Sequence, residues 1–144
     1  MALNGEAKSK IAEMFLFMAD RAEHIEEVIK NNKNNTIISD RSMISGIAYA
    51  STLSIDELIN LNLIATDNTL PSHVILLELT PAELKCRLSQ KENDSIELRG
   101  IDYLINIQNR MKETIQKLNI NHIFIDASLK IEEIEKKIED FINV

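Results

Sequence analysis

The chain has 144 residues, a length that fits one domain with a substantial core. Hydrophobic residues make up 44% of it and charged residues 27%, so the composition is that of a soluble globular protein and indicates neither disorder nor a membrane span. The formal net charge of -7 argues against a nucleic acid as the main partner, because nucleic-acid binders concentrate basic residues on one face.

The first part of the chain predicts a long helix and then a short strand. Apolar residues recur at every third or fourth position between Ile11 and Ile29, which predicts an amphipathic helix over about residues 7–30. The asparagine-rich segment 31–35 ends this helix, because asparagine competes for backbone hydrogen bonds and tolerates turns. The apolar segment 36–39 then predicts a strand.

The remainder of the chain predicts strands that alternate with helices. The almost continuous apolar run at 74–79 is typical of a buried parallel strand, and Thr80 and Pro81 suit the cap and first turn of a helix that follows it. Other helices are expected at 56–63, 101–118 and 131–141, and another strand at 122–126. This alternation indicates an α/β fold with a parallel sheet.

The opening residues and the single cysteine favour a cytoplasmic protein. Residues 1–6 have neither the basic opening nor the apolar stretch of a secretory signal. Cys86 cannot form an internal disulfide, which suits a reducing compartment. His24, His73 and His122 lie far apart in the sequence and have no cysteine partner, so no zinc site is expected.

Phe17 and Arg21 are the first candidate pair for binding a ligand. They stand four residues apart on the predicted helix, so their side chains share a face. An aromatic ring and a guanidinium on one face can stack on a nucleobase and hydrogen-bond its edge. The same spacing fits a core phenylalanine beside a surface arginine, and the spacing alone favours this second interpretation.

Asp40 and Arg41 form the second candidate pair. They stand at the carboxyl end of the predicted strand, where open α/β sheets place their ligand-binding groups. Arg41 can bind a phosphate with two hydrogen bonds, and Asp40 can hold Mg²⁺ through water. An ion pair at the end of a strand is the alternative, because an Asp-Arg dipeptide alone is weak evidence.

Both pairs belong to a longer series of motifs. In chain order the series reads F-x-A-x-R at 17–21, D-R-x at 40–42, S-G-x-A-Y at 45–49, a polar segment at 89–97 and D-A-S at 126–128. In order and spacing this series resembles the thymidylate kinases from one end of the chain to the other.

The resemblance implies that dTMP and ATP are the substrates. Phe17 matches the aromatic residue that stacks on thymine, and Arg21 matches the arginine that reads the pyrimidine edge. Arg41 matches the arginine that binds the 5′-phosphate of dTMP. Asp40 matches the carboxylate near Mg²⁺ and the transferring phosphoryl group, so the resemblance makes Asp40 and Arg41 the catalytic candidates.

The resemblance also implies which residues surround the sugar and the adenine. Ser45, Gly46 and Tyr49 match residues that close around the base and deoxyribose of dTMP, with the aromatic ring disfavouring a 2′-hydroxyl. The loop beside the adenine of ATP is matched by Asp126, Ala127 and Ser128.

The lid, expected at about 89–99, departs from the family pattern. Many relatives carry D-R-x-E there, whereas this chain has serine in place of the arginine at position 95. Arg87, Lys91 or Arg99 can stand in for the arginine that stabilises the transferring charge, or that arginine belongs to a segment absent from this sequence.

A second departure concerns the phosphates of ATP. The printed sequence contains no G-x-x-x-x-G-K-[ST] motif, the glycine-rich loop that cradles phosphates. We therefore expect the fold of P-loop nucleoside-monophosphate kinases, a parallel sheet with helices on both faces, without its first βαβ segment. In this interpretation residues 1–144 form a single domain that corresponds to the last three quarters of a thymidylate kinase.

The implied reaction is transfer of a phosphoryl group from ATP to dTMP, giving ADP and dTDP. Without the glycine-rich loop the chain by itself is expected to be inactive or weakly active, and unstable if nothing else covers its sheet. The alternatives are a deoxynucleoside kinase relative and a non-catalytic nucleotide-binding remnant. The family also implies a homodimer, to which Ile11, Met14 and Met18 can contribute unless they pack inside the fold.

Overall fold

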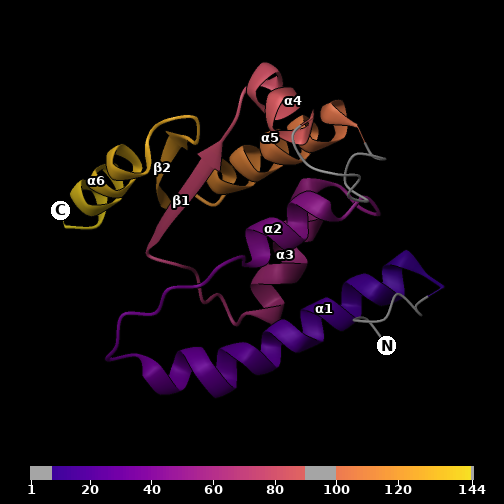
Figure 1. Ribbon diagram of the computed structural model, residues 1–144. Helices are drawn as coiled ribbons and strands as arrows, with labels where there is room; N and C mark the ends of the chain where they lie inside the picture. Colours follow the sequence, from indigo (N-terminus) through magenta and orange to yellow (C-terminus); the bar gives the residue numbers. More distant parts are fainter. Residues whose placement is uncertain (1–7, 90–99, 144) are drawn as a thin grey trace. The chain divides into compact units, whose positions relative to one another are not determined.

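The computed structural model describes residues 8–89 and 100–143. The chain forms two compact units, with the boundary between Leu70 and Pro71. The described part of the first unit contains helices, and that of the second contains a parallel sheet with its own helices (Figure 1). Within the described residues, no helix is long and apolar enough to cross a membrane.

The first unit contains α1 (Lys10–His24), α2 (Met43–Tyr49) and α3 (Ile55–Ala65). Beyond His24 the chain continues as a π-helical turn, Ile25–Ile29, and a 3-10 turn, Lys30–Asn32. The predicted long helix is therefore present, but its hydrogen-bond pattern changes over its last two turns. The sequence pattern does not predict α2, because its seven residues are too few to show a clear period.

Apolar side chains from all three helices form the core of the first unit. α3 packs against both α1 and α2. Ile47 of α2 and Leu58 of α3 are fully buried, and Met14 and Met18 of α1 are 8% and 5% exposed. The two methionines that the sequence offered for a dimer surface thus lie inside this unit.

A capping box sets the start of α3. The Ser54 backbone N–H donates to the Glu57 carboxylate over 2.9 Å, and the Glu57 backbone N–H donates to the Ser54 hydroxyl over 3.3 Å. These two bonds satisfy backbone groups that a helix start leaves without partners. They explain why α3 begins one residue earlier than the apolar pattern predicts.

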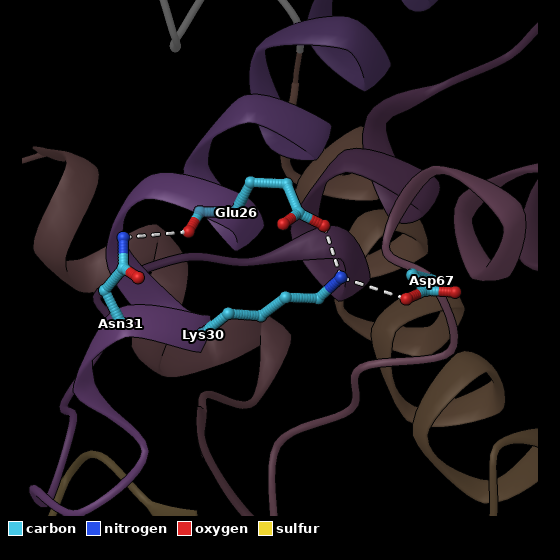
Figure 2. A network of polar contacts seen from close by, with 4 residues as sticks. All are labelled: Glu26, Lys30, Asn31 and Asp67. Carbon is cyan, nitrogen blue, oxygen red and sulfur yellow. Dashed lines mark hydrogen bonds and ion pairs between the residues drawn. The ribbon is translucent and has the colours of Figure 1, made fainter.

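A polar network joins the end of the first helical segment to the turn after α3 (Figure 2). The Lys30 ammonium donates to the Glu26 carboxylate one turn earlier and, over 2.9 Å, to the carboxylate of Asp67. The Asn31 amide donates to the Glu26 and Glu27 carbonyls. The hydrogen bonds to Glu26 and Asp67 raise the pKa of Lys30, and the bond from Lys30 lowers the pKa of Asp67.

The second unit contains two strands and three helices among its described residues. They are, in chain order, β1 (His73–Glu78), α4 (Pro81–Ser89), α5 (Ile101–Lys117), β2 (Asn121–Asp126) and α6 (Ile131–Ile142). β1 and β2 are parallel neighbours, in a register that pairs each residue of β1 with the residue 48 positions later, from His73 with Asn121 to Glu78 with Asp126.

Helices contact both faces of this sheet. Lys112 of α5 bonds the Glu78 carboxylate and lies 4.9 Å from the centre of the Phe124 ring. Glu78 and Phe124 share one face, because side chains alternate along a strand and the register aligns even positions with even positions. His73 points to the other face, where its ring meets Phe141 of α6 at 5.3 Å. The predicted α/β class, with a parallel sheet between helices, is confirmed.

Two strand predictions need correction. Residues 36–39 are not a strand: the described sheet consists of β1 and β2, and Ile38 is 93% exposed. An apolar run forms a strand only where a neighbour accepts its backbone hydrogen bonds, and the described residues place none beside this segment. β1 exists where predicted but is not buried throughout, since Ile75 and Leu77 are 36% and 49% exposed.

Candidate functional site

Helix α2 separates its core residues from its motif residues by face. One side of the helix is buried and carries Met43, Ile44, Ile47 and Ala48. The other side carries Ser45, which is half-buried, Gly46, which is exposed, and Tyr49, which is 41% exposed. The residues that match the sugar- and base-binding motif are therefore those that the core does not use.

The exposure of Phe17 and Arg21 on α1 differs from that of a core phenylalanine beside a surface arginine. Phe17 is 45% exposed, so it is not a core residue. Arg21 is half-buried, and its Nη1 donates to the Oδ1 of Asn62 on α3 over 2.5 Å. The structure thus leaves the aromatic ring accessible and holds the guanidinium in place.

The Arg21 guanidinium also lies against α2. A Cβ atom built on Gly46 would stand 2.6 Å from the Nη2 of Arg21, closer than such atoms approach in proteins. Burial lowers the pKa of Arg21, and the nearby charge of Asp20 raises it in part. Arg21 remains a cation at any physiological pH, so a positive charge is held between α1, α2 and α3.

Asp40 and Arg41 lie in the segment that leads into α2, just before its N-cap Ser42. Arg41 has φ 69°, a left-handed conformation that costs a residue with a side chain about 1 to 3 kcal/mol. The Ser39 hydroxyl supports this turn by donating to the Arg41 carbonyl over 2.8 Å. A strained turn of this kind persists only where its surroundings hold it, and such turns cluster at functional sites.

The side chains of Asp40 and Arg41 are both exposed. Within residues 8–89 and 100–143, neither forms an ion pair or a side-chain hydrogen bond, so the strand-end ion pair is not present there. The Asp40 oxygens and the Arg41 fork are therefore available to a ligand.

Hard oxygen donors such as the Asp40 carboxylate suit Mg²⁺, which keeps several waters and takes ligands from phosphate oxygens. The described part of the chain has no group of three or more His, Cys, Asp and Glu placed to hold a metal. If Mg²⁺ binds here, the exposed Asp40 carboxylate is the side chain of this segment whose chemistry fits it.

In the second unit, Asp126, Ala127 and Ser128 form a turn at the end of β2. The Asp126 carboxylate accepts from the Ser128 backbone N–H over 2.8 Å, and the Ala127 N–H donates to the Glu78 carbonyl over 2.9 Å. Hydrogen bonds from the hydroxyl and backbone of Ser128 lower the pKa of Asp126. The turn is therefore hydrogen-bonded to β1 through the Ala127 N–H, and the Asp126 side chain closes it.

Arg87 of α4 reaches the same turn. Its Nη2 donates to the Ala127 carbonyl over 2.5 Å, and its Nε lies 3.5 Å from the carboxylate of Glu83 one helical turn earlier. The structure therefore brings one lid candidate, Arg87, to the predicted adenine loop. The other candidates, Lys91 and Arg99, and lid residues 90–99 lie outside the described residues.

Sequence reasoning did not find Asn62. Its helix was predicted, and Asn62 follows Leu58 and Ile59 at the spacing of the buried face. A polar residue at an apolar position of an amphipathic helix was the available signal. Asn62 is 2% exposed, and its partner Arg21 lies 41 residues away in the chain, so no local pattern connects the two.

Comparisons with known proteins agree with the motif series. A family model described as thymidylate kinase matches residues 1–138. A protein named thymidylate kinase from Aliarcobacter butzleri is 81% identical over all 144 residues, which cover 76% of that relative. Relatives of the same name from Nautilia profundicola and Sulfurimonas denitrificans are 52% and 48% identical, with 94% and 100% of this chain aligned to 70% and 77% of theirs. The chain belongs to the thymidylate kinase family.

Proposed function

We propose that this chain binds dTMP and takes part in the transfer of a phosphoryl group from ATP to it, giving ADP and dTDP. The observation that carries the proposal is the different environment of two residues in the first unit. The Phe17 ring is accessible, whereas the Arg21 guanidinium is held beside Gly46. A base reader needs an exposed ring and an oriented donor, whereas a purely structural pair would bury the ring and leave the arginine in solvent.

In this proposal the first unit binds the acceptor nucleotide. Phe17 stacks on the thymine ring, and Arg21 donates to its carbonyl edge. Ser45 and Tyr49, both on the outer side of α2, lie beside the deoxyribose, where the Tyr49 ring disfavours a 2′-hydroxyl. These roles follow the motif series and use only side chains that the core leaves accessible.

Arg41 and Asp40 act at the phosphate of dTMP. The Arg41 guanidinium binds the 5′-phosphate with charge-assisted hydrogen bonds, which a planar fork makes in pairs. Asp40 would hold Mg²⁺ through water, and the ion would supply neutralisation of charge on the phosphates of ATP. Positioning and neutralisation of charge account for most catalysis of phosphoryl transfer, so two exposed groups next to each other suit this role.

The turn formed by Asp126, Ala127 and Ser128 takes the adenine of ATP. Its geometry is fixed by bonds to β1 and to Arg87, so its backbone is presented in one conformation. Arg87, Lys91 and Arg99 stay candidates for the cation that stabilises the transferring charge. Of these, Arg87 is already committed to the Ala127 carbonyl in this structure.

We further propose a cytoplasmic homodimer that uses the exposed side of α1. Ile11 is 49% exposed, whereas Met14 and Met18 are buried and cannot contribute to a surface. Sedimentation of the chain and of Ile11→Glu tests this. A charge at the interface should shift a dimer to monomer, and a monomer at all concentrations would contradict the proposal.

Binding of dTMP and thymidine to the 144-residue chain tests the acceptor site directly. Arg41→Ala should weaken dTMP binding about ten- to a hundred-fold, the effect of losing hydrogen bonds to a charged group, and leave thymidine binding unchanged. Lys33→Ala is the matched control, because it removes an exposed positive charge from the preceding turn.

Three results would count against the proposal. Equal dTMP affinity in the chain and in Arg41→Ala would remove Arg41 from the site. Equal losses in Arg41→Ala and Lys33→Ala would indicate a general effect of charge. Thymidine bound as tightly as dTMP would favour the deoxynucleoside kinase alternative, because the acceptor of such a kinase carries no 5′-phosphate.

A further inference from the structure

Asn62 is a buried amide with both ends of its side chain engaged. Its Nδ2 donates to the Leu58 carbonyl one turn earlier over 2.7 Å, and its Oδ1 accepts from Arg21 Nη1 over 2.5 Å. The side chain is 2% exposed, so no solvent competes for either bond. A carbonyl can only accept and a guanidinium can only donate, which determines the orientation of the amide.

This bond also orients the guanidinium. Arginine has five N–H donors in a planar fork, and Asn62 occupies the inner edge through Nη1. The Nη2 end lies over Gly46, which is exposed on the outer side of α2. The Nη2 donors, which Asn62 does not take, therefore lie on the side of α2 that carries Gly46, Ser45 and Tyr49.

The space that the guanidinium occupies exists because residue 46 has no side chain. Any Cβ there would stand 2.6 Å from Nη2, so the arginine would have to move. Nη2 is the far end of a flexible side chain, and moving it requires no change in the helices. Glycine at position 46 therefore decides where Arg21 can lie.

The partner of Arg21 is neutral. A half-buried arginine that serves stability alone usually faces a carboxylate, because burial of an uncompensated charge is costly. Here the buried partner is an amide, and the charged neighbour that acts on Arg21 is the exposed Asp20. An amide orients the guanidinium without neutralising it, so the cation remains attractive to an electron-rich ligand atom.

We propose that Asn62 is a positioning residue that holds Arg21 in the orientation that reads the pyrimidine, in a space left open by Gly46. The proposal rests on the proposed function, since it assumes that Arg21 contacts the base. It predicts that selectivity between pyrimidines depends on a buried residue that touches no nucleotide.

Variants at three positions test the proposal in the 144-residue chain. Asn62→Leu removes the acceptor at similar volume, and Gly46→Ala displaces Arg21 without changing Asn62. Each should lower the preference for dTMP over dCMP by about tenfold or more, toward the value in Arg21→Ala, because one hydrogen bond to a charged group is lost.

Thr66→Val separates positioning from general destabilisation. Thr66 is 2% exposed at the C-terminal cap of the same helix, and its hydroxyl donates to backbone carbonyls, that of Asn62 over 3.0 Å. It should lower the melting temperature and leave the preference for dTMP unchanged. Because alanine is a better helix former than glycine, Gly46→Ala should fold even if Asn62→Leu does not.

Guanidinium NMR signals of Arg21 provide a readout that needs no nucleotide. Rotation of the guanidinium should be slow in the chain and in Thr66→Val, and faster in Asn62→Leu and Gly46→Ala. Slow rotation or an unchanged dTMP preference in both of these variants would overturn the proposal. So would loss of the preference in Thr66→Val.

Failure of the proposed function has a different signature. If Arg21→Ala leaves the preference for dTMP intact, Arg21 does not read the base, and the proposed function and this inference fall together. If Arg21→Ala abolishes the preference while Asn62→Leu and Gly46→Ala keep it, the proposed function stands and only the positioning role is refuted.

Discussion

Replacing Phe17 with alanine should affect nucleotide binding more than stability. Full burial of a phenylalanine is worth about 1.5 to 3 kcal/mol. Phe17 is 45% exposed, so the chain loses only about half of that, roughly 1 to 1.5 kcal/mol. Alanine returns about 0.5 kcal/mol as the better helix former, which leaves a net loss of about 0.5 to 1 kcal/mol. Loss of base stacking should weaken dTMP binding by about 1 to 3 kcal/mol.

Phe15→Ala is the matched control for this prediction. Phe15 lies on the same helix two residues earlier and is 51% exposed, so the substitution should cost a similar amount of stability. Urea unfolding and dTMP titration are measured for both variants and the unchanged chain. Equal changes in dTMP affinity for Phe15→Ala and Phe17→Ala would refute the stacking role. A loss of about 3 to 5 kcal/mol in stability for Phe17→Ala is the cost of truncating a buried phenylalanine, and it would show that Phe17 is a core residue.

Three further predictions concern backbone strain and charge. Arg41→Gly should be more stable than Arg41→Ala by about 1 kcal/mol in urea unfolding, because only glycine adopts the φ of 69° without strain. Equal stabilities would show that the backbone of residue 41 is not strained. The stability that Asp67 contributes should be present at neutral pH and lost as the pH falls from about 3.9, its unfolded pKa, through its lowered folded pKa. The difference in unfolding free energy between the chain and Asp67→Asn should therefore shrink in acid. A difference that grows in acid would contradict this sign. Ser128→Ala should raise the pKa of Asp126 in a carboxyl NMR titration, because the hydrogen bond from the Ser128 hydroxyl is the main cause of the lowered pKa. An unchanged pKa would assign the lowering to the Ser128 backbone N–H alone.

Local periodicity was sufficient for the elements that pack along their whole length. α5 and β2 begin and end within one residue of their predicted bounds, because each shows a clear apolar pattern and ends at a turn. The segment at 36–39 has the same composition as a strand, yet it lies outside the described sheet. Periodicity reports which side chains prefer burial, but a strand also needs a hydrogen-bonded neighbour, and that depends on residues elsewhere.

Helix α2 shows the converse limit. It is short, and small residues interrupt its apolar positions, so the motif was noticed while the helix was not. The structure explains why the motif has this composition: Ile47 and Ala48 fill the core, and Gly46 leaves room for Arg21. The site residues on α2 could be listed from sequence, but their common face could be seen only once the helix was known.

The pair Phe17 and Arg21 shows where the deciding information lies. Spacing on α1 admits both a structural and a ligand-binding interpretation, and it favours the structural one. The position of Arg21 is set by residues outside α1: Asn62 of α3 accepts a hydrogen bond from the guanidinium, and Gly46 leaves space for it on α2. With Arg21 turned toward these partners, Phe17 is left at the surface with nearly half of its area exposed. A site built in this way depends on contacts between separate helices, so a change at Asn62 or Gly46 should alter base selection while the motif on α1 remains unchanged.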